Sequence, residues 1–312
     1  MRVVVMAYQD IGYVCLDELL SLGANVAAVV THPDDPREAI WFRSVADRAR
    51  SAGVPVLQPA SVNRPEVADE IARLAPDVIF SFYFREIVSR EILALPSHGA
   101  LNLHGSLLPR YRGRCPVNWV LVHGETETGV TLHYMEPRPD TGDIVAQLVV
   151  PIAEEVTALT LNRKLGVAAR ALLRETFPRL VAGTAPRIPQ DHTQASYFGG
   201  RRPEDGRLVW SQTARQLYNL VRAVTHPYPG AFTSWRGQQL FVWRARALEE
   251  APVAAPGEVV AISSQGILVA AGGGALLLDQ VQLAGEDEQP AREFAPRVGL
   301  VVGDRLGGHE RC

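Results

Sequence analysis

The stretch Arg2–Thr31, RVVVMAYQDIGYVCLDELLSLGANVAAVVT, sets the architecture of the first half of the chain. Arg2–Ala7 is a short β-branched run, which is typical of a buried parallel strand. Ile11–Leu22 has the apolar spacing of a helix, and Asn25–Thr31 is a second apolar strand. This strand–helix–strand unit predicts a parallel sheet with right-handed crossovers. The first turn, AYQDIG, lacks the glycines of a dinucleotide site, so the sequence does not favour NAD.

Helix and strand patterns alternate from this unit onward. The predicted helices are Ser44–Ala52, a helix capped by Asn63 and running to Leu74, and Arg85–Leu95; the predicted strands are Val54–Leu57, Asp77–Phe84 and Gly99–His104. Such alternation predicts an α/β fold with an open, doubly wound, mostly parallel sheet. Ligands of such sheets bind outside the carboxyl ends of the strands.

The second half of the chain has a different pattern. Helices are predicted at Arg114–Val122, Thr157–Leu180 and Thr213–Ala223, and strands at Thr128–Met135 and Ile144–Val150. From Pro227 onward, short strand-like runs alternate with glycine or proline, as in a small β-barrel, and Gly272–Gly274 is predicted to be a hairpin turn. We therefore predict a first domain at residues 1–185, a linker at 186–205 and a C-terminal β-barrel domain at 206–312.

The composition indicates a globular protein of a reducing cytoplasm. The 312 residues are 47% hydrophobic with a net charge of −3, which gives no general attraction to nucleic acid or to an anionic membrane. Lys164 is the sole lysine, so basic charge comes almost entirely from arginine. Cys15, Cys115 and Cys312 have no metal-ligand spacing, so no metal is expected. No stretch is long and apolar enough to cross a membrane.

Asn102, His104 and Asp140 are the candidate catalytic residues. Residues i and i+2 of a strand share a face, so Asn102 and His104 can point into one cleft. The imidazole can exchange a proton near neutral pH, and the amide can donate to an oxyanion, which together suit acyl transfer to an amine. Asp140, on a loop flanked by proline and glycine, would orient the imidazole and favour its protonated form. The alternative is a structural hydrogen-bonding pair beside a turn aspartate.

Three arginines follow the candidate pair in the loop SLLPRYRGR. Pro109 and Gly113 restrict the path of this loop, and Arg110, Arg112 and Arg114 place cations beside the candidate site. For Arg110 and Arg112, a solvated basic loop is an equal alternative. Arg114 leads into a predicted helix and is the strongest of the three as a ligand contact.

The segment Asn102–Gly113, NLHGSLLPRYRG, with the later Asp140-Thr-Gly, resembles the signature of the 10-formyltetrahydrofolate-dependent formyltransferases. The resemblance extends to four further segments, Ser81–Arg85, Asn118–His133, Phe198–Gly206 and His226–Phe232. Within that family, these segments look most like the formyltransferase half of the bifunctional enzyme that formylates UDP-4-amino-4-deoxy-L-arabinose, a sugar of lipid A modification. The resemblance implies a Rossmann-like catalytic domain, a small OB-like barrel, and 10-formyltetrahydrofolate as co-substrate.

The resemblance also implies residue roles. His104 would be the catalytic acid and base, Asn102 would stabilise the transition state, and Asp140 would tune His104. Folate contacts would be made, largely by backbone atoms, at Glu86, Ile87, Val88, Arg114, Glu136, Pro137, Arg138, Pro139 and Asp140. Glu86 and Cys115 depart from the histidine and alanine expected at these positions, which puts the Glu86 contact in doubt.

A nucleotide-linked amino sugar, above all UDP-4-amino-4-deoxy-L-arabinose, is the acceptor that the resemblance implies. Arginine forks suit its diphosphate, and Arg201 and Arg202 are candidates, with a solvated linker as the alternative. Methionyl-tRNA would require an extended basic surface, whereas HPDDPREAIWF and GEDEQ lean acidic. A dTDP-amino-dideoxyhexose is a further alternative, and glycinamide ribonucleotide is weaker. A non-catalytic folate or sugar-nucleotide sensor is disfavoured because all three candidate catalytic residues are present. The oligomeric state, including a homo-oligomer, is left open.

Overall fold

The computed structural model describes residues 1–36, 38–250 and 252–307, so Cys312 lies outside the described residues. The chain divides into two compact units, each described by itself below. The first contains Met1–Pro116, Thr126–Ile152 and Leu161–Gly199; the second contains Val117–Glu125, Ala153–Thr160 and the chain from Gly200 onward. The boundaries predicted at residues 185 and 205 stay predictions.

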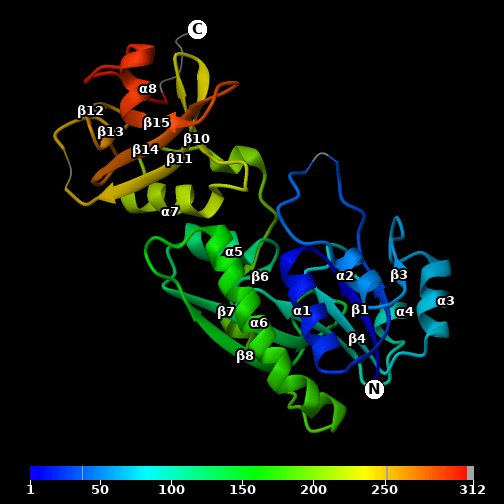
Figure 1. The fold of residues 1–312 in the computed structure, drawn as a ribbon. Helices are drawn as coiled ribbons and strands as arrows, with labels where there is room; N and C mark the ends of the chain where they lie inside the picture. The colour runs from blue at the N-terminus through cyan, green and yellow to red at the C-terminus, as the bar shows by residue number, and fades with distance from the viewer. Residues whose placement is uncertain (37, 251, 308–312) are drawn as a thin grey trace. The chain divides into compact units, whose positions relative to one another are not determined.

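A mostly parallel sheet forms the centre of the first unit (Figure 1). Its strands are β1 (Arg2–Ala7), β2 (Asn25–Val30), β3 (Val56–Leu57), β4 (Val78–Phe82), β5 (Ala100–His104), β7 (Glu127–Tyr134) and β8 (Ile144–Pro151). They lie in the order β3-β2-β1-β4-β5-β7-β8, with β1 to β5 parallel and β7 and β8 antiparallel. The direction in which successive strands are added to the sheet reverses between β1 and β4. Ligands of open sheets bind in the crevice outside the carboxyl ends of the strands at such a point.

Helices cover both faces of this sheet, which confirms the predicted α/β fold. The helices are α1 (Gln9–Ser21), α2 (Val45–Ser51), α3 (Pro65–Arg73), α4 (Arg90–Leu93) and α6 (Ala158–Val181), nearly all of which lies in the first unit. On one face, Ile71 of α3 and Ile92 of α4 pack in one core with Ile79 of β4. The next residue of β4, Phe80, points to the other face, where it contacts Phe177 of α6.

A buried carboxylate with two arginine partners joins α1 to α6 on that second face. The side chain of Glu18 is 1% exposed, and it accepts a hydrogen bond from Nε of Arg174 at 2.8 Å. Nε of Arg170 lies 3.4 Å from the same carboxylate. Because a buried carboxylate without a partner would be costly, these two arginines fix the position of α6 against α1.

The structure corrects two helix predictions. Asn63 does not cap α3, whose N-cap is Arg64; instead its amide donates to the Ile87 carbonyl and accepts from the Ser89 amide, both at 2.8 Å. The helix predicted for Arg85–Leu95 is therefore reduced to α4, because side chains bind the Arg85 amide, the Ile87 carbonyl and the Ser89 amide in place of helical partners.

An antiparallel sheet forms the second unit, as predicted. The elements of this unit are α5 (Pro116–Val122), α7 (Ala214–Val224), β10 (Ala231–Trp235), β11 (Gln238–Leu248), β12 (Val259–Ser263), β13 (Gly266–Ala270), β14 (Ala275–Leu283), β15 (Gln289–Pro290) and α8 (Ala291–Val298). The strand order is β10-β11-β14-β13-β12, with β15 paired to β14. Gly272–Gly274 joins β13 to β14, which confirms the predicted hairpin turn.

A two-stranded parallel ribbon completes the first unit. β6 (Arg112–Gly113) pairs with β9 (Tyr197–Phe198), and a 3₁₀ turn at His192–Gln194 precedes β9. The stretch up to Gly199 lies within the first unit, and the linker predicted at residues 186–205 stays a prediction. Within the described part of the chain, none of the helices combines the length and apolarity that crossing a bilayer requires.

Candidate active site

The end of β5 and the loop between β7 and β8 bring the predicted catalytic residues together. Asn102 and His104 lie on one face of β5, as the two-residue spacing predicted. His104 is 6% exposed, and its Nδ1 lies 3.6 Å from Oδ1 of Asp140. The carboxylate is itself nearly buried, so its charge acts on the imidazole with little screening by water.

The hydrogen bonds of His104 decide which ring nitrogen can exchange a proton. Its Nε2 lies 2.7 Å from the carbonyl oxygen of Tyr111. A carbonyl only accepts, so Nε2 must carry the hydrogen of this bond. The other nitrogen, Nδ1, faces the Asp140 carboxylate and is the position at which a proton can be gained or lost.

Asp140 is held in a demanding conformation. Its φ is +59°, a left-handed value that is uncommon for a non-glycine residue, although aspartate adopts it more readily than most. Oδ2 accepts a hydrogen bond from the Gly113 amide at 2.8 Å. Burial alone would raise the pKa of the carboxyl, but the positive charges that His104 and His133 carry when protonated, together with the Gly113 N–H, hold that pKa well below its usual range. Asp140 is therefore ionised at neutral pH.

His133 is a fourth residue of the site, which the sequence analysis missed. It lies on β7 directly opposite Asn102 and is 1% exposed. Its Nδ1 donates to the Tyr134 carbonyl at 2.7 Å, which leaves Nε2 as the acceptor in the neutral ring. Nε2 lies 3.2 Å from Nδ2 of Asn102 and 3.5 Å from Oδ1 of Asp140. The contact with Asn102 turns the amide nitrogen toward His133 and leaves its second hydrogen to donate elsewhere.

The predicted folate segment at Glu86, Ile87 and Val88 is anchored by neighbouring loops. The Glu86 carboxylate accepts hydrogen bonds from the Ser61 hydroxyl at 2.6 Å and from the Val62 amide at 3.2 Å. Nε2 of His32 accepts from the Arg85 amide at 3.1 Å. Burial lowers the pKa of His32 despite the charge of Glu86, so Nε2 keeps the lone pair that this bond requires. The side chain of Glu86 therefore braces the loop.

The remainder of this segment is fixed through its backbone. Asn63 bonds to the Ile87 carbonyl and the Ser89 amide, while the Ile87 side chain is 71% exposed and Val88 is buried. Such bracing gives a fixed backbone edge, which is what recognition of a planar heterocycle by backbone atoms requires.

The other predicted folate contacts lie on exposed loops of the same unit. Arg114 is exposed, and its amide donates to the Phe198 carbonyl at 2.9 Å. Glu136, Pro137, Arg138 and Pro139 are exposed and lead into Asp140. The guanidinium carbon of Arg138 lies 4.9 Å from the centre of the Tyr197 ring.

The arginines of the SLLPRYRGR loop differ in their surroundings. Arg110 and Arg114 are exposed. Arg112 is only 1% exposed, so the alternative of a solvated basic loop is wrong for this residue. The structure thus places a buried cation one residue before Gly113, whose amide binds the candidate carboxylate.

Arg201 and Arg202 belong to the second unit. Nη2 of Arg201 donates to the Asp205 carbonyl at 2.8 Å, and its guanidinium carbon lies 4.6 Å from the centre of the Trp119 ring. The Arg202 amide donates to Oδ2 of Asp205 at 2.7 Å. Their role in binding a diphosphate stays a prediction.

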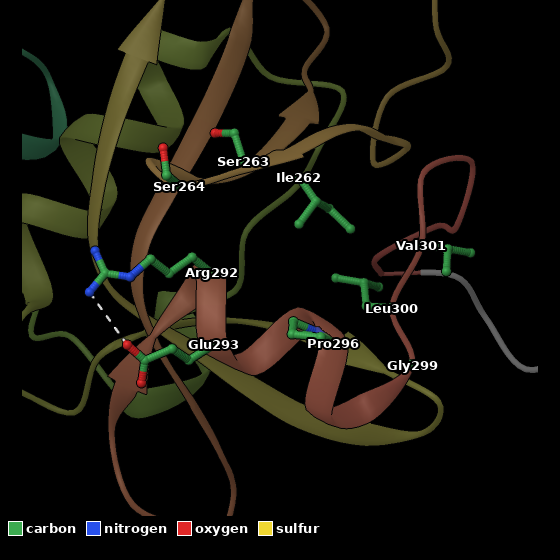
Figure 2. Close-up of a pocket in the computed structure, with 9 residues that line it drawn as sticks. All are labelled: Ile262, Ser263, Ser264, Arg292, Glu293, Pro296, Gly299, Leu300 and Val301. Carbon is green, nitrogen blue, oxygen red and sulfur yellow. Dashed lines mark hydrogen bonds and ion pairs between the residues drawn. The ribbon is translucent and has the colours of Figure 1, made fainter.

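A pocket of the second unit lies between the β12–β13 turn and α8 (Figure 2). Its lining combines the apolar Ile262, Leu300 and Val301 with the ion pair of Arg292 and Glu293. None of the predicted site residues lines it. Among the residues that the structure describes, no group of three histidine, cysteine or carboxylate side chains could hold a metal ion.

Comparison with known families gives two matches along the chain. A family described as Formyl transferase matches residues 1–176. A second, described as Formyl transferase, C-terminal domain, matches residues 201–298. The first match includes Asn102, His104, His133 and Asp140, and the two together span most of both units.

Solved structures of similar fold include two sugar-modifying enzymes. WlaRD, a sugar 3N-formyl transferase solved with dTDP and 5-N-formyl-THF, has a TM-score of 0.70 at 18% identity, over 92% of this chain and 99% of its own. The N-formyltransferase from Helicobacter canadensis, in complex with folinic acid and dTDP-3-aminofucose, has a TM-score of 0.70 at 20% identity, over 88% and 98%.

HypX from Aquifex aeolicus in complex with tetrahydrofolic acid has a TM-score of 0.66 at 18% identity. It matches 100% of this chain, which spans 50% of the HypX chain. At these identities the three structures establish a common fold.

Proposed function

The chain belongs to the formyl transferase family and takes its formyl group from 10-formyltetrahydrofolate; we propose that it delivers this group to the amine of a nucleotide-linked amino sugar. The observation that carries the proposal is the arrangement of Asn102, His104 and Asp140 at the carboxyl end of β5. Within the family match, these three residues supply the donor, the base and the carboxylate that acyl transfer to an amine requires.

Each of the three residues has a separate proposed role. When bound, the folate supplies an activated formyl carbonyl, on whose oxygen negative charge develops during attack. His104 takes the proton of the attacking amine at Nδ1, because Nε2 is committed to the Tyr111 carbonyl, and returns it to the departing folate nitrogen as the bond from that nitrogen to the formyl carbon breaks. Asp140 stabilises the resulting imidazolium from 3.6 Å. Asn102, oriented by His133, donates its second amide hydrogen to the formyl oxygen. Loss of one such donor costs about 3 kcal/mol in other acyl-transfer enzymes.

The proposed folate site is supported by two preformed backbone segments. The segment Glu86–Val88 is braced from the loop at 61–63, and the segment at 136–140 is exposed up to Asp140. Contacts made by backbone atoms tolerate Glu86 at a position where the sequence resemblance leads us to expect histidine, because its carboxylate already has protein partners. The structure thus offers fixed polar edges without requiring a particular side chain at position 86.

A dTDP-linked amino deoxyhexose is the acceptor that we propose first. Two proteins of similar fold were solved with dTDP or dTDP-3-aminofucose, which supports this class over UDP-4-amino-4-deoxy-L-arabinose, the substrate that the sequence resemblance favoured. The UDP sugar remains the second candidate. Methionyl-tRNA is disfavoured by the net charge of −3 and by the acidic segments after β2 and β14.

A side-by-side assay tests both the chemistry and the acceptor. The enzyme is given 10-formyltetrahydrofolate with dTDP-3-aminofucose, UDP-4-amino-4-deoxy-L-arabinose or methionyl-tRNA, and formylated product is measured by mass spectrometry. We expect turnover highest with the dTDP sugar. A preference for the tRNA would overturn the proposed substrate class, and a preference for the UDP sugar would overturn the choice between the two sugars.

Variants test the catalytic assignment independently of the acceptor. His104→Ala and Asn102→Ala should fold and lose nearly all activity with every acceptor. His98→Ala is the matched control, because His98 is an exposed histidine just before β5 and should leave activity unchanged. Full activity in His104→Ala would refute the mechanism.

A further inference from the structure

Gln190, on the stretch just before β9, makes four hydrogen bonds with its side-chain amide. It is 7% exposed. Its Nε2 donates to the carbonyl oxygen of Asp140 at 3.0 Å and to that of Gly142 at 2.7 Å. Its Oε1 accepts from Nε of Arg112 at 3.2 Å and from Nη2 of the same guanidinium at 2.5 Å. Both hydrogens and both lone pairs of the amide are therefore used.

These partners allow a single orientation of the amide. The two carbonyls can only accept, and the guanidinium can only donate. An inverted amide would place its oxygen against the carbonyls of Asp140 and Gly142 and its nitrogen against Arg112. Gln190 thus couples a buried cation to the backbone of the loop that carries the candidate carboxylate.

The loop held by Gln190 needs support at this point. Asp140 has φ +59°, a left-handed value that is unfavourable for most residues with a side chain. Gly142 packs so closely that a Cβ there would meet the Tyr134 carbonyl oxygen at 2.2 Å. A glutamine that binds the carbonyls on both sides of Thr141 opposes relaxation of this turn.

Arg112 has two further side-chain partners besides Gln190. Nη1 donates to the Tyr197 hydroxyl at 2.7 Å, and Nη2 lies 3.0 Å from Nδ1 of His192. The next residue, Gly113, donates its amide to the Asp140 carboxylate. Gln190 therefore holds Asp140 through its backbone carbonyl. Arg112 holds it through the neighbouring Gly113, whose amide binds the Asp140 side chain.

We propose that Gln190 is a positioning residue of the formyl transfer reaction, which holds the Asp140 turn so that the carboxylate faces His104. Arg112 acts one step further away, by orienting the Gln190 amide. This inference rests on the proposed function, because it assigns a purpose to the geometry of Asp140. Gln190 touches neither substrate nor reacting atoms in this role.

Two variants of Gln190 separate positioning from folding. Gln190→Ala removes the amide, and Gln190→Glu keeps its size and its contact with Arg112 but removes both N–H donors. Each should lower kcat by about 100-fold, the loss that a displacement of about 1 Å from productive geometry can cause. Full activity in Gln190→Glu would overturn the proposal even if the alanine variant failed to fold.

A double-variant comparison tests whether Gln190 acts through Asp140. If it does, Gln190→Ala combined with Asp140→Asn should have the kcat of Asp140→Asn alone. Losses that multiply would overturn the proposal. The matched control is Gln282→Ala in the second unit, since that amide also accepts from a side chain, Trp243, and donates to a backbone carbonyl, that of Glu286. It should leave kcat unchanged.

An NMR titration gives a readout that does not depend on turnover. The Asp140 carboxyl, labelled with ¹³C and assigned with Asp140→Asn, should titrate at higher pH in Gln190→Ala than in the native protein. The reason is that a relaxed turn withdraws the carboxylate from the His104 and His133 rings and from the Gly113 amide. An unchanged titration would overturn the proposal. A shifted titration in Gln190→Ala together with full activity of Asp140→Asn would instead refute the catalytic role of Asp140.

Discussion

Replacement of Gly113 by alanine should damage both stability and activity, and Gly183 provides a matched control. Both glycines have left-handed backbones, with φ of +95° and +68°. A Cβ at Gly113 would meet the Phe198 carbonyl oxygen at 2.3 Å, whereas a Cβ at Gly183 has nothing within 4 Å. The two substitutions therefore share the conformational cost and differ in the steric one.

The magnitudes follow from the contacts. The left-handed conformation costs an alanine about 1–2 kcal/mol at either position. At Gly113 the Phe198 carbonyl must also move, which weakens the bond it accepts from the Arg114 amide, a loss of about 1 kcal/mol. The charge-assisted bond from the Gly113 amide to Asp140 adds about 2 kcal/mol. We expect a loss of about 4–5 kcal/mol for Gly113→Ala against about 1–2 kcal/mol for Gly183→Ala.

Denaturant unfolding and steady-state kinetics of the two variants test this reasoning. The free energy of unfolding should fall about 3 kcal/mol further in Gly113→Ala than in Gly183→Ala. Its kcat should fall by about 100-fold, because the Asp140 carboxylate loses a fixed donor, while Gly183→Ala keeps native kcat. Equal stability and equal kcat in the two variants would refute the account of the Asp140 turn.

Three further predictions follow from the site. The lowered pKa of Asp140 contributes stability that is fully present above about pH 4, where an unfolded aspartate is ionised, and that is lost as the pH falls toward the lower pKa of the folded state. The free energy of unfolding of the native protein should therefore fall more steeply below about pH 4 than that of Asp140→Asn, and parallel profiles would contradict this. Iodoacetamide should label Cys115 and spare Cys15, whose buried thiol has a raised pKa. Folinic acid should slow the labelling of Cys115, because this residue follows Arg114, a predicted folate contact; peptide mass spectrometry showing Cys15 modified first would count against the prediction. His133→Phe should lower kcat about tenfold with little change in KM, because the Asn102 amide loses its acceptor; a raised KM with native kcat would rule this out.

Local pattern was sufficient for much of the first unit. Apolar runs predicted the strands from β1 to β5 within a few residues, because strands buried on both faces are continuous in sequence. The two-residue spacing of Asn102 and His104 predicted their shared face for the same local reason.

The helix at Ala291–Val298 of the second unit was missed, since Pro296 lies inside it and a proline normally argues against a helix interior.

Contacts between distant segments were beyond the reach of local pattern. His133 faces Asn102 only because β5 and β7 pair in one particular register, which no short-range signal specifies. Gln190 lies 50 residues from Asp140 in the chain, in a stretch whose glycines and prolines predicted a linker. The Asn63 side chain was assigned to a helix cap because its competing partners, Ile87 and Ser89, lie 24 and 26 residues away in the sequence.

The ribbon of β6 and β9 has a consequence for dissecting or recombining this protein. A fragment that ends at residue 185, where sequence pattern places a domain boundary, would lack Gln190 and the strand that pairs with Arg112–Gly113. Cleavage or gene fusion at that point would leave the strands of the main sheet intact while releasing the Asp140 turn. A chimera that exchanges C-terminal halves should therefore be joined after Gly199, so that each N-terminal half keeps the residues that shape its own reaction centre.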